Sequence, residues 1–347
     1  MLRNIESVDP EKNVKVEEEH VYHTSNVDIP DPDQLNFLTS DMKIEISHHE
    51  KNTNKQTTFA NDSIFAKSEG EETVFAISVD GSNHSSYGFE LVTKEFLKPT
   101  SRLIIVHIFS FELDKYYNYQ NKRDTVLYNY STKLVPYKTQ STFLAENREP
   151  RVYHALEQVN RIVSRKECNY LIIGYYGIKG PKGSNEELSK GISYALGNAI
   201  TPVIMVKELS LRCNTKSGGF RWCFIFDKQY SNCIRSFLAF SELVNPEKDF
   251  VYGFSLLPSY INFDLNKREF HQEIKLRGIK NFEYEAEEYK KDPGKIVLEK
   301  VNHCQEPFDF VVIYNNANRH RDNPENNENI DIIKYCVSNI CFVNSIK

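Results

Sequence analysis

The feature that most constrains the fold of this chain is a regular alternation of short apolar runs with segments of helical periodicity, beginning near residue 73. Val74–Val79 is such a run and ends at Asp80-Gly81, and Leu103–Ile108 is the next. Continuous apolar runs that end in turns are typical of strands buried on both faces. Strands alternating with helices predict an α/β protein with a parallel sheet covered by helices on both sides.

Residues 71–208 are expected to form one such unit. Its predicted strands are Val74–Val79, Leu103–Ile108, 137–146, Tyr170–Ile173 and Val203–Val206. Its predicted helices are a first helix capped by Ser82 or Asn83 that stops before Pro99, a tyrosine-rich helix over Phe111–Tyr130, an amphipathic helix over Pro150–Lys166, and Gly191–Asn198. Ligands of such sheets bind beyond the carboxyl ends of the strands.

The same order of elements recurs after a polar linker at 209–219. The predicted strands of this second unit, 220–347, are Trp222–Phe226, Phe250–Phe254, Phe282–Tyr289, Phe308–Tyr314 and Ile340–Val343. Its predicted helices are centred on 234–243, 293–301 and 330–337. The match between the two halves predicts an internal duplication with copies of about 130 residues.

The first 70 residues differ from the rest, since they are polar, poor in aromatic residues and without a sustained apolar period. Such a segment buries too little apolar surface to offset its ordering entropy, so an extended tail is predicted. Leu35–Leu38 and Ile44–Ile46 are its candidate apolar anchors. The tail is interpreted either as a solvated arm or as a segment that becomes ordered on a partner.

Composition excludes several classes of function. The 43 basic and 48 acidic residues leave no basic footprint for nucleic acid or an anionic membrane. No apolar run reaches the roughly 18–20 residues of a membrane span, and the first residues lack an apolar signal core. The seven cysteines are odd in number, widely spaced and without a CxxC pair, which favours a reducing compartment, and hence the cytoplasm, over disulfides or zinc.

Four segments of the first unit resemble a known family: FAISVDGS at 75–82, IIVHIFS at 104–110, CNYLIIGYYG at 168–177 and GISYALGNAITPVIMVK at 191–207. Their order and spacing resemble the universal stress protein fold, present here in tandem with the second copy degenerate. The resemblance implies two units, each a five-stranded parallel sheet with helices on both faces. It also implies that two copies can pair through the edges of their final strands, which would cover the C-terminal strand.

In the ATP-binding branch of that family, the resemblance implies an adenine-nucleotide site, with ATP or AMP as ligand in the first unit. An aspartate contacts the nucleoside, backbone at the end of the second strand contacts the base, and a loop G-x2-G-x9-G-[ST] surrounds the phosphates. Glycines let backbone N–H groups approach a phosphate, and a helix N-terminus adds donors. The matching positions of this sequence are Asp80, Ser82, Ile108, Gly174, Gly177, Gly191 and Ser193.

The loop departs from the family pattern. Thirteen residues separate Gly177 from Gly191 where the pattern has nine, and Ile192 follows Gly191, with Ser193 one place later. Loss of a hydroxyl donor to a phosphate would cost about 1.5–3 kcal/mol. Lysines at 179, 182 and 190 are candidate substitutes for it, or are simply part of the loop surface.

The second copy has lost these features. Asp227 ends its first strand, but Lys228-Gln229 follows instead of Gly-Ser, and the loop 315–329 contains no glycine. We therefore expect no nucleotide there and interpret this copy as kept for packing or contact. The Gly218-Gly219 pair resembles the phosphate loop of ATP pyrophosphatases but precedes a strand, so it is interpreted as linker.

No catalytic motif is visible: the chain has no metalloprotease HExxH, no GxSxG elbow and no Walker A sequence. His84 is expected at a helix start and His107 in the core. Nothing combines a nucleophile with a base, so the protein is predicted not to be an enzyme, with weak ATP hydrolysis the one activity left open.

Two hypotheses of function remain. The favoured one is a non-catalytic interaction or scaffold protein of a large eukaryotic assembly, such as a cytoskeletal or ciliary lattice. Its partners would bind the 1–70 tail and the tyrosine-rich segment 111–130, while the two units pair with each other. The alternative is a stress-response regulator that binds ATP or AMP and changes its partner affinity with it.

Overall fold

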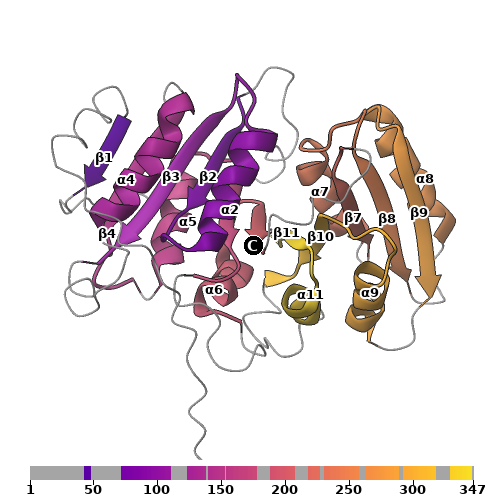
Figure 1. Ribbon diagram of the computed structural model, residues 1–347. Helices are drawn as coiled ribbons and strands as arrows, with labels where there is room; N and C mark the ends of the chain where they lie inside the picture. Colours follow the sequence, from indigo (N-terminus) through magenta and orange to yellow (C-terminus); the bar gives the residue numbers. More distant parts are fainter. Residues whose placement is uncertain are drawn as a thin grey trace, which may run out of the picture.

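The computed structural model describes residues 43–47, 72–110, 123–137, 140–152, 154–177, 188–207, 218–226, 230–257, 263–288, 292–317 and 329–345. It shows two α/β lobes side by side, one formed by the first half of the chain and one by the second (Figure 1). Among these residues, no helix is both long and apolar enough to cross a membrane. The α/β class predicted from the sequence is confirmed.

The first lobe contains six parallel strands in the order β1-β4-β3-β2-β5-β6. Their bounds are β1 Lys43–Ser47, β2 Val74–Ser78, β3 Arg102–Phe109, β4 Ser141–Asn147, β5 Tyr170–Gly174 and β6 Val203–Val206. Four of these strands, β2, β3, β5 and β6, lie within a residue or two of the predicted ranges, because buried parallel strands are nearly continuous apolar runs.

Helices cover both faces of this sheet. They are α2 Asn83–Leu91 with the short π-helix η1 Val92–Phe96, α4 Arg123–Leu134 with the short 3-10 helix η2 Val135–Tyr137, α5 Ala155–Arg165 and α6 Lys190–Asn198. Buried residues of α2, η1 and α4 belong to one apolar core, and those of α5 and α6 to the other. The predicted helix over Phe111–Tyr130 is seen as α4, which continues to Leu134, and residues 111–122 lie outside the described part.

The second lobe repeats this plan with five parallel strands in the order β11-β10-β7-β8-β9. Its elements are β7 Arg221–Phe226, α7 Tyr230–Ser241, β8 Phe250–Leu257, α8 Phe263–Leu276, β9 Asn281–Glu288, α9 Pro293–Asn302, β10 Phe310–Asn315, α11 Asn329–Tyr335 and β11 Asn339–Asn344. The helix α8 was not predicted, because its sequence FDLNKREFHQEIKL has few apolar residues.

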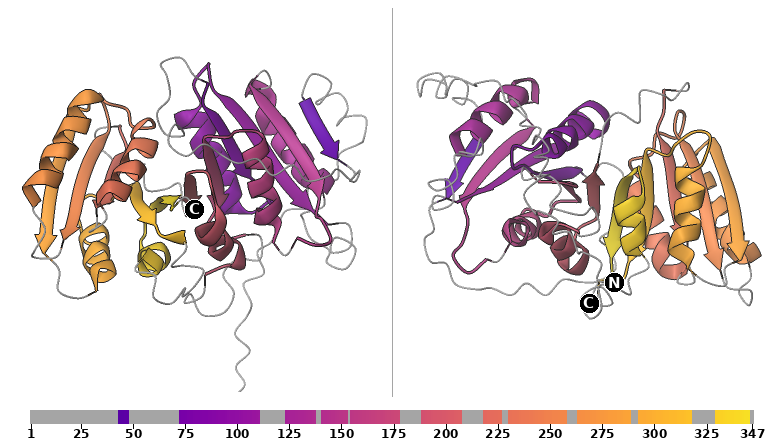
Figure 2. Two further views of the ribbon diagram at one scale, coloured as in Figure 1. Left: turned by 180° about the vertical axis from the view of Figure 1, so that it is seen from behind. Right: turned by 60° about the horizontal axis from the view of Figure 1, so that its bottom comes forward.

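The two lobes share one sheet. β6 and β11 pair antiparallel, with Met205 opposite Ile340 and Val203 opposite Phe342, which gives eleven continuous strands. The yellow strand β11 lies next to the first lobe in all views (Figures 1 and 2). Each of the two apolar cores contains residues of both lobes.

Aromatic packing strengthens this junction. Phe96, at the end of η1, lies 5.9 Å from Phe220, 6.3 Å from Trp222 and 6.0 Å from Phe310, measured between ring centroids. The Tyr170 hydroxyl donates a 2.6 Å hydrogen bond to the Ala239 carbonyl of α7. Because the side chains that bury each lobe come partly from the other, we infer that the two lobes fold as one body.

Side chains at the ends of β6 and β11 cap helices across the junction. The ammonium of Lys207, which follows β6, donates 2.6 Å hydrogen bonds to the carbonyls of Ile333 and Cys336 at the end of α11. In the mirrored position, Asn344 of β11 donates to the carbonyls of Ala195 and Ala199 at the end of α6. Unpaired carbonyls at a helix C-terminus need such donors, so each lobe completes a helix of the other.

The structure shows a strand, β1, within the N-terminal segment that was predicted to be an extended tail. The sequence indicated an extended segment over residues 1–70 with a candidate anchor at Ile44–Ile46. That anchor lies within β1, which pairs in parallel with the outer edge of β4 from Lys43 opposite Thr142 to Ser47 opposite Glu146. The first lobe therefore has six strands, not five, and the rest of the 1–70 segment, up to residue 71, lies outside the described residues.

The paired glycines between the lobes have a packing role. Gly218 has a φ of +71°, which favours glycine, and a Cβ on Gly219 would lie 2.0 Å from the Lys248 carbonyl oxygen. The strand β7 therefore starts where two backbones touch. The buried Asp249 carboxylate holds this crossing by accepting hydrogen bonds from the Phe220 N–H and the Trp222 indole.

Candidate functional site

The turn after β2 begins the helix α2. Gly81 has a φ of +83°, and the Asp80 carboxylate accepts a 3.0 Å hydrogen bond from the Ser82 N–H. Ser82 is the N-cap, and its hydroxyl accepts a 3.2 Å hydrogen bond from the Ser85 N–H. The DGS sequence thus has a local role, since it closes the turn and satisfies a helix N–H that has no carbonyl partner.

The loop after β5 folds onto this turn. A Cβ added to Gly177 would lie 2.8 Å from Oδ2 of Asp80, so the loop backbone lies directly against that carboxylate. The Ser82 hydroxyl donates a 3.3 Å hydrogen bond to the Tyr176 carbonyl. A Cβ on Gly174 would lie 2.8 Å from the Cβ of His84 and 3.1 Å from backbone atoms of His84 and Ser85. Four predicted site residues, Asp80, Ser82, Gly174 and Gly177, therefore meet.

Aromatic side chains flank this contact. The His84 ring lies edge-on to Tyr176 at 5.3 Å between centroids, and Tyr176 lies 4.5 Å from Tyr175. The Lys207 ammonium lies 4.4 Å from the centre of the Tyr175 ring. Burial lowers the pKa of Lys207 to about 8 and raises the pKa of Tyr175 to about 12. These aromatic side chains and Lys207 connect the loop after β5 to the junction between the lobes.

Gly191 and Ser193 lie in the first turn of α6. Ser189 is the N-cap, and its hydroxyl accepts a 3.3 Å hydrogen bond from the Ile192 N–H. The Ser193 N–H donates to the Ser189 carbonyl, and a Cβ on Gly191 would lie 3.1 Å from Cδ1 of Leu156 in α5. The first turns of α5 and α6 are therefore neighbours, and the positive ends of their dipoles lie at the same edge of the sheet.

Basic side chains lie close to the starts of α5 and α6. His154 is the N-cap of α5, although its side chain makes no capping hydrogen bond. Burial, together with the charges of Arg148 and Lys190, lowers the pKa of His154. The Arg148 guanidinium is held by hydrogen bonds of 3.3 and 3.1 Å to the Val152 carbonyl. Arg148 and His154 were not predicted as site residues. The predicted helix Pro150–Lys166 included His154, but α5 begins only at Ala155, and the fold brings both residues near α6.

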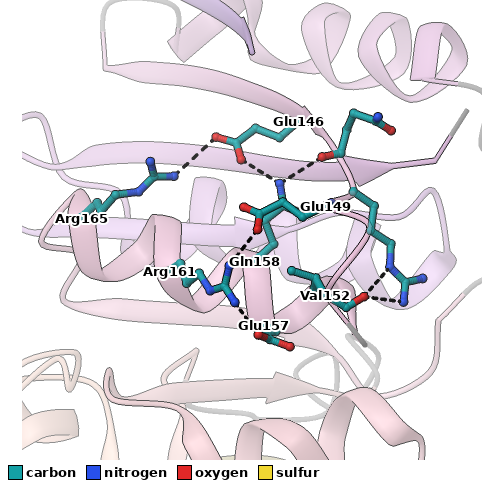
Figure 3. Close-up of polar contacts among 9 residues, drawn as sticks. Glu146, Glu149, Val152, Glu157, Gln158, Arg161 and Arg165 are labelled. Atoms are coloured by element: carbon teal, nitrogen blue, oxygen red, sulfur yellow. Dashed lines mark hydrogen bonds and ion pairs between the residues drawn. The ribbon is translucent and has the colours of Figure 1, made fainter. Parts of the chain in front are cut away.

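A buried glutamine holds this region together. Gln158 of α5 is 1% exposed and donates hydrogen bonds of 2.9 Å to Glu146 and 3.1 Å to the Asn147 carbonyl. Its amide oxygen accepts a 3.1 Å hydrogen bond from the Glu149 N–H, so the side chain ties α5 to the end of β4 (Figure 3). The carboxylates of Glu149 and Glu157 both contact Arg161 on the outer side.

Ile108 lies on β3 at the same edge, directly opposite Glu146 of β4, and is half-buried. Nearby, His107 is 2% exposed, and its Nδ1 lies 2.9 Å from the Val79 carbonyl oxygen, where it donates a hydrogen bond. Burial lowers the pKa of His107, and its Nε2 has no protein partner within the described part of the chain. His107 is thus a neutral core residue, and His84 lies at a helix start, as the sequence indicated for both.

The second lobe differs at the matching place. By strand register, Phe75 pairs with Tyr170 in the first lobe and Trp222 with Phe310 in the second, which places Tyr314 where the first lobe has Gly174. Tyr314 is buried, and α7 nevertheless contacts β10, since the Ser236 hydroxyl donates a 3.3 Å hydrogen bond to the Ile313 carbonyl. Residues 227–229 and 318–328, which carry the other predicted losses, lie outside the described residues. So do residues 178–187, with two of the candidate lysines.

Within the described ranges, no group of three or more His, Cys, Asp or Glu side chains is arranged to hold a metal ion. The described cysteines are all free thiols, and burial raises the pKa of Cys168 to about 12. The described part of this edge brings together the Asp80 carboxylate, the backbone of Gly177, the starts of α5 and α6, and the basic side chains of Arg148, His154 and Lys190.

Comparison with known proteins shows which solved structures have a similar fold. No protein-family model matches the chain, and no curated protein matches it. Among solved structures, a putative universal stress protein and a functionally unknown protein, both from Pseudomonas aeruginosa, each match with a TM-score of 0.54 at 11% identity. These matches cover 82% of this chain and 95% of the other.

A universal stress protein from Archaeoglobus fulgidus matches with a TM-score of 0.51 at 11% identity, over 78% of this chain and 96% of its own. At such low identity the likeness concerns the fold alone. The chain has the universal stress protein fold, and the extent of these matches fits an arrangement of two units.

Proposed function

We propose that this protein is a non-catalytic binding protein, with an adenine nucleotide at the carboxyl edge of its first lobe and protein partners elsewhere on its surface. The observation that carries the nucleotide proposal is the contact of Gly177 with the Asp80 carboxylate. A ligand at this point would meet a hydrogen-bond acceptor for ribose hydroxyls beside the backbone of a glycine, which has no side chain of its own.

Electrostatics supports a negatively charged ligand. The first turns of α5 and α6 are neighbours, and the cations Arg148 and Lys190 lie close enough for their charges to lower the pKa of His154 there. Helix N-termini and cations both favour phosphate groups. These cations take the place of the hydroxyl that the family pattern expects directly after Gly191. The proposal concerns binding of the nucleotide and not its turnover.

The two loop glycines carry different weight. Gly174 is explained by packing alone, since a Cβ there would meet the backbone of α2. Gly177 faces only the end of the Asp80 side chain. A valine at 177 would therefore displace the carboxylate and fill the space beside it, while the turn could adjust.

Titration of the purified protein with a fluorescent ATP analogue tests the proposal. We expect saturable binding that Asp80→Asn and Gly177→Val each weaken by at least about ten-fold, equivalent to about 1.4 kcal/mol. Asp124→Asn is the matched control, because it makes the same chemical change at an exposed ion pair on α4. Absence of saturable binding, or equal binding by all four proteins, would refute the nucleotide site.

We further propose that the protein serves as an interaction module of a larger cytoplasmic assembly, such as a cytoskeletal or ciliary lattice. The shared sheet supports this, because it joins the second lobe, for which we expect no nucleotide, to the first lobe. Co-sedimentation with the native assembly tests it. We expect association of the full chain and its loss on removal of 1–70. Removal of 1–42 alone keeps β1 and shows whether the loss comes from residues before β1 or from the rest of the segment. A full chain that stays in the supernatant would refute the role.

A further inference from the structure

The outer edge of the second lobe is an open strand. β9, Asn281–Glu288, is the last strand of the sheet and pairs only with β8 among the described strands. It lies at the margin of the molecule, beside α8 (Figure 1). Eight residues at about 3.3 Å each give an edge of about 26 Å, which presents unpaired N–H and C=O groups to solvent.

Three of the four glutamates of this strand share one face. Glu283, Glu285 and Glu287 alternate along β9, as period two requires. The charge of Glu285 is compensated, since its carboxylate accepts hydrogen bonds from Tyr252 and, at 2.5 Å, from Lys300. Glu283 and Glu287 are exposed, as is Glu288, and no ion pair involves them in the described part of the chain. The acidic row is therefore open to a partner.

The opposite face of β9 is apolar along Phe282 and Tyr284, which are partly covered, and ends in the exposed Glu288. Phe282 and Tyr284 pack against α8, with Phe282 6.4 Å and Tyr284 5.3 Å from Phe270 between ring centroids. Phe282 nevertheless remains 37% exposed, and Leu276 at the end of α8 is 70% exposed. A strand added beside β9 would thus meet carboxylates on one side and apolar surface on the other.

Charge decides what can pair with this edge. Two copies of β9 placed edge to edge would bring glutamate rows together, and like charges opposite each other on paired strands are destabilising. The same repulsion excludes nucleic acid and anionic membranes. A strand with lysine or arginine at alternate positions would instead place a cation beside Glu283 and Glu287.

We propose that the β9 edge binds an extended, lysine- or arginine-rich segment of a partner protein by adding it as a strand to the sheet. The site deepens the interaction role proposed above by naming a surface and the chemistry of its partner, and it does not depend on the nucleotide site.

Binding of an alternating lysine–threonine octapeptide to the full chain tests this inference. We expect saturable binding that weakens with salt and falls about ten-fold or more in the double variant Glu283→Lys/Glu287→Lys. Glu269→Lys/Glu299→Lys is the matched control, because it makes the same charge change at exposed positions of α8 and α9, outside β9 itself. Unchanged fluorescence of Trp222 verifies that both variants are folded.

A second peptide separates strand addition from simple charge attraction. Methylation of alternate backbone nitrogens keeps every lysine but removes the N–H groups that would pair with β9, so this peptide should bind at least about ten-fold more weakly. Hydrogen exchange should slow at every second amide of 281–288 when the unmethylated peptide is bound. Equal binding of the two peptides, protection without this period, or indifference to the Glu283/Glu287 reversal would each overturn the proposal. If the reversal abolishes peptide binding while co-sedimentation with the assembly persists, the β9 edge is not the docking surface, although the interaction role stands.

Discussion

The shared sheet predicts that a small defect deep in the first lobe destabilises the second. Ile105 lies in the middle of β3 and is 0% exposed, and Trp222, the single tryptophan of the chain, lies on β7. Six strand spacings separate β3 from β7, or about 29 Å at about 4.8 Å each. No direct contact can therefore carry the effect of Ile105→Val to Trp222, so only cooperative folding of the two lobes can.

The expected magnitude follows from the deleted methylene. Removal of one buried methyl group costs about 1 kcal/mol of unfolding free energy. With a urea m-value of about 3 kcal/mol/M, the unfolding midpoint should fall by about 0.3 M. Tryptophan fluorescence reports Trp222 in the second lobe together with its contact to Phe96 of the first, and far-UV circular dichroism reports both lobes as a whole. We expect the two transitions to coincide in the parent protein and to shift together in Ile105→Val.

Independent lobes would give a different result. The circular dichroism transition would then broaden or split, while the Trp222 midpoint stayed at its parent value. Asp124→Asn, an exposed change on α4, controls for general effects and should leave both midpoints in place, since exposed ion pairs contribute little. A fixed Trp222 midpoint in Ile105→Val would refute the inference that the lobes fold as one body.

Three further outcomes can be measured on the same protein. Gly174→Ala should lower stability by about 1–3 kcal/mol in urea unfolding, because its Cβ meets backbone of α2, whereas Gly177→Ala should cost less and mainly displace the Asp80 carboxylate. For Lys207, the folded pKa of about 8 lies below the unfolded value, so the unfolded state binds more protons between pH 8 and 10.5. Stability of the parent relative to Lys207→Met should therefore rise over that range, and a flat difference would contradict this. The folded pKa of His107 is also lowered, so stability should fall as the pH drops below about 6.5, by up to about 1.4 kcal/mol per pH unit. His107→Gln should remove that part of the fall in acid unfolding curves.

The sequence was sufficient to predict those elements whose burial produces a continuous or periodic pattern of apolar residues. The strands β2, β3, β5 and β6 are buried on both faces and read as unbroken apolar runs, and α5 shows its buried face through Val159, Ile162 and Val163. The helix α8 has no such signal, because it covers the edge of the sheet and its residues 267–269 are exposed. Strand β1 was visible only as a short apolar anchor, since its pairing depends on the open edge of β4.

The candidate site was predictable where one motif follows another and not where loops converge. Asp80 and Ser82 follow a strand, and the glycines follow another, so their meeting at one edge follows from parallel strands. Arg148 precedes the predicted helix Pro150–Lys166, and His154 lies in the part of it that is not helical in the structure. Their position beside α6 comes from the packing of α5 on its neighbour, which a single sequence does not display.

The glycines of the loop after β5 show how a retained motif can mislead. Gly174 is required by the close approach of α2 in the first lobe, so its presence in this chain would be expected with or without a ligand. The second lobe keeps its sheet with Tyr314 at that place, so the glycine serves the packing of the first lobe and is not required by the fold in general. Gly177 is different, since it touches one carboxylate and no backbone. A protein that had abandoned the nucleotide could replace Gly177 by a small side chain at little cost, so the argument for ligand binding rests on this glycine and on Asp80 rather than on the motif as a whole.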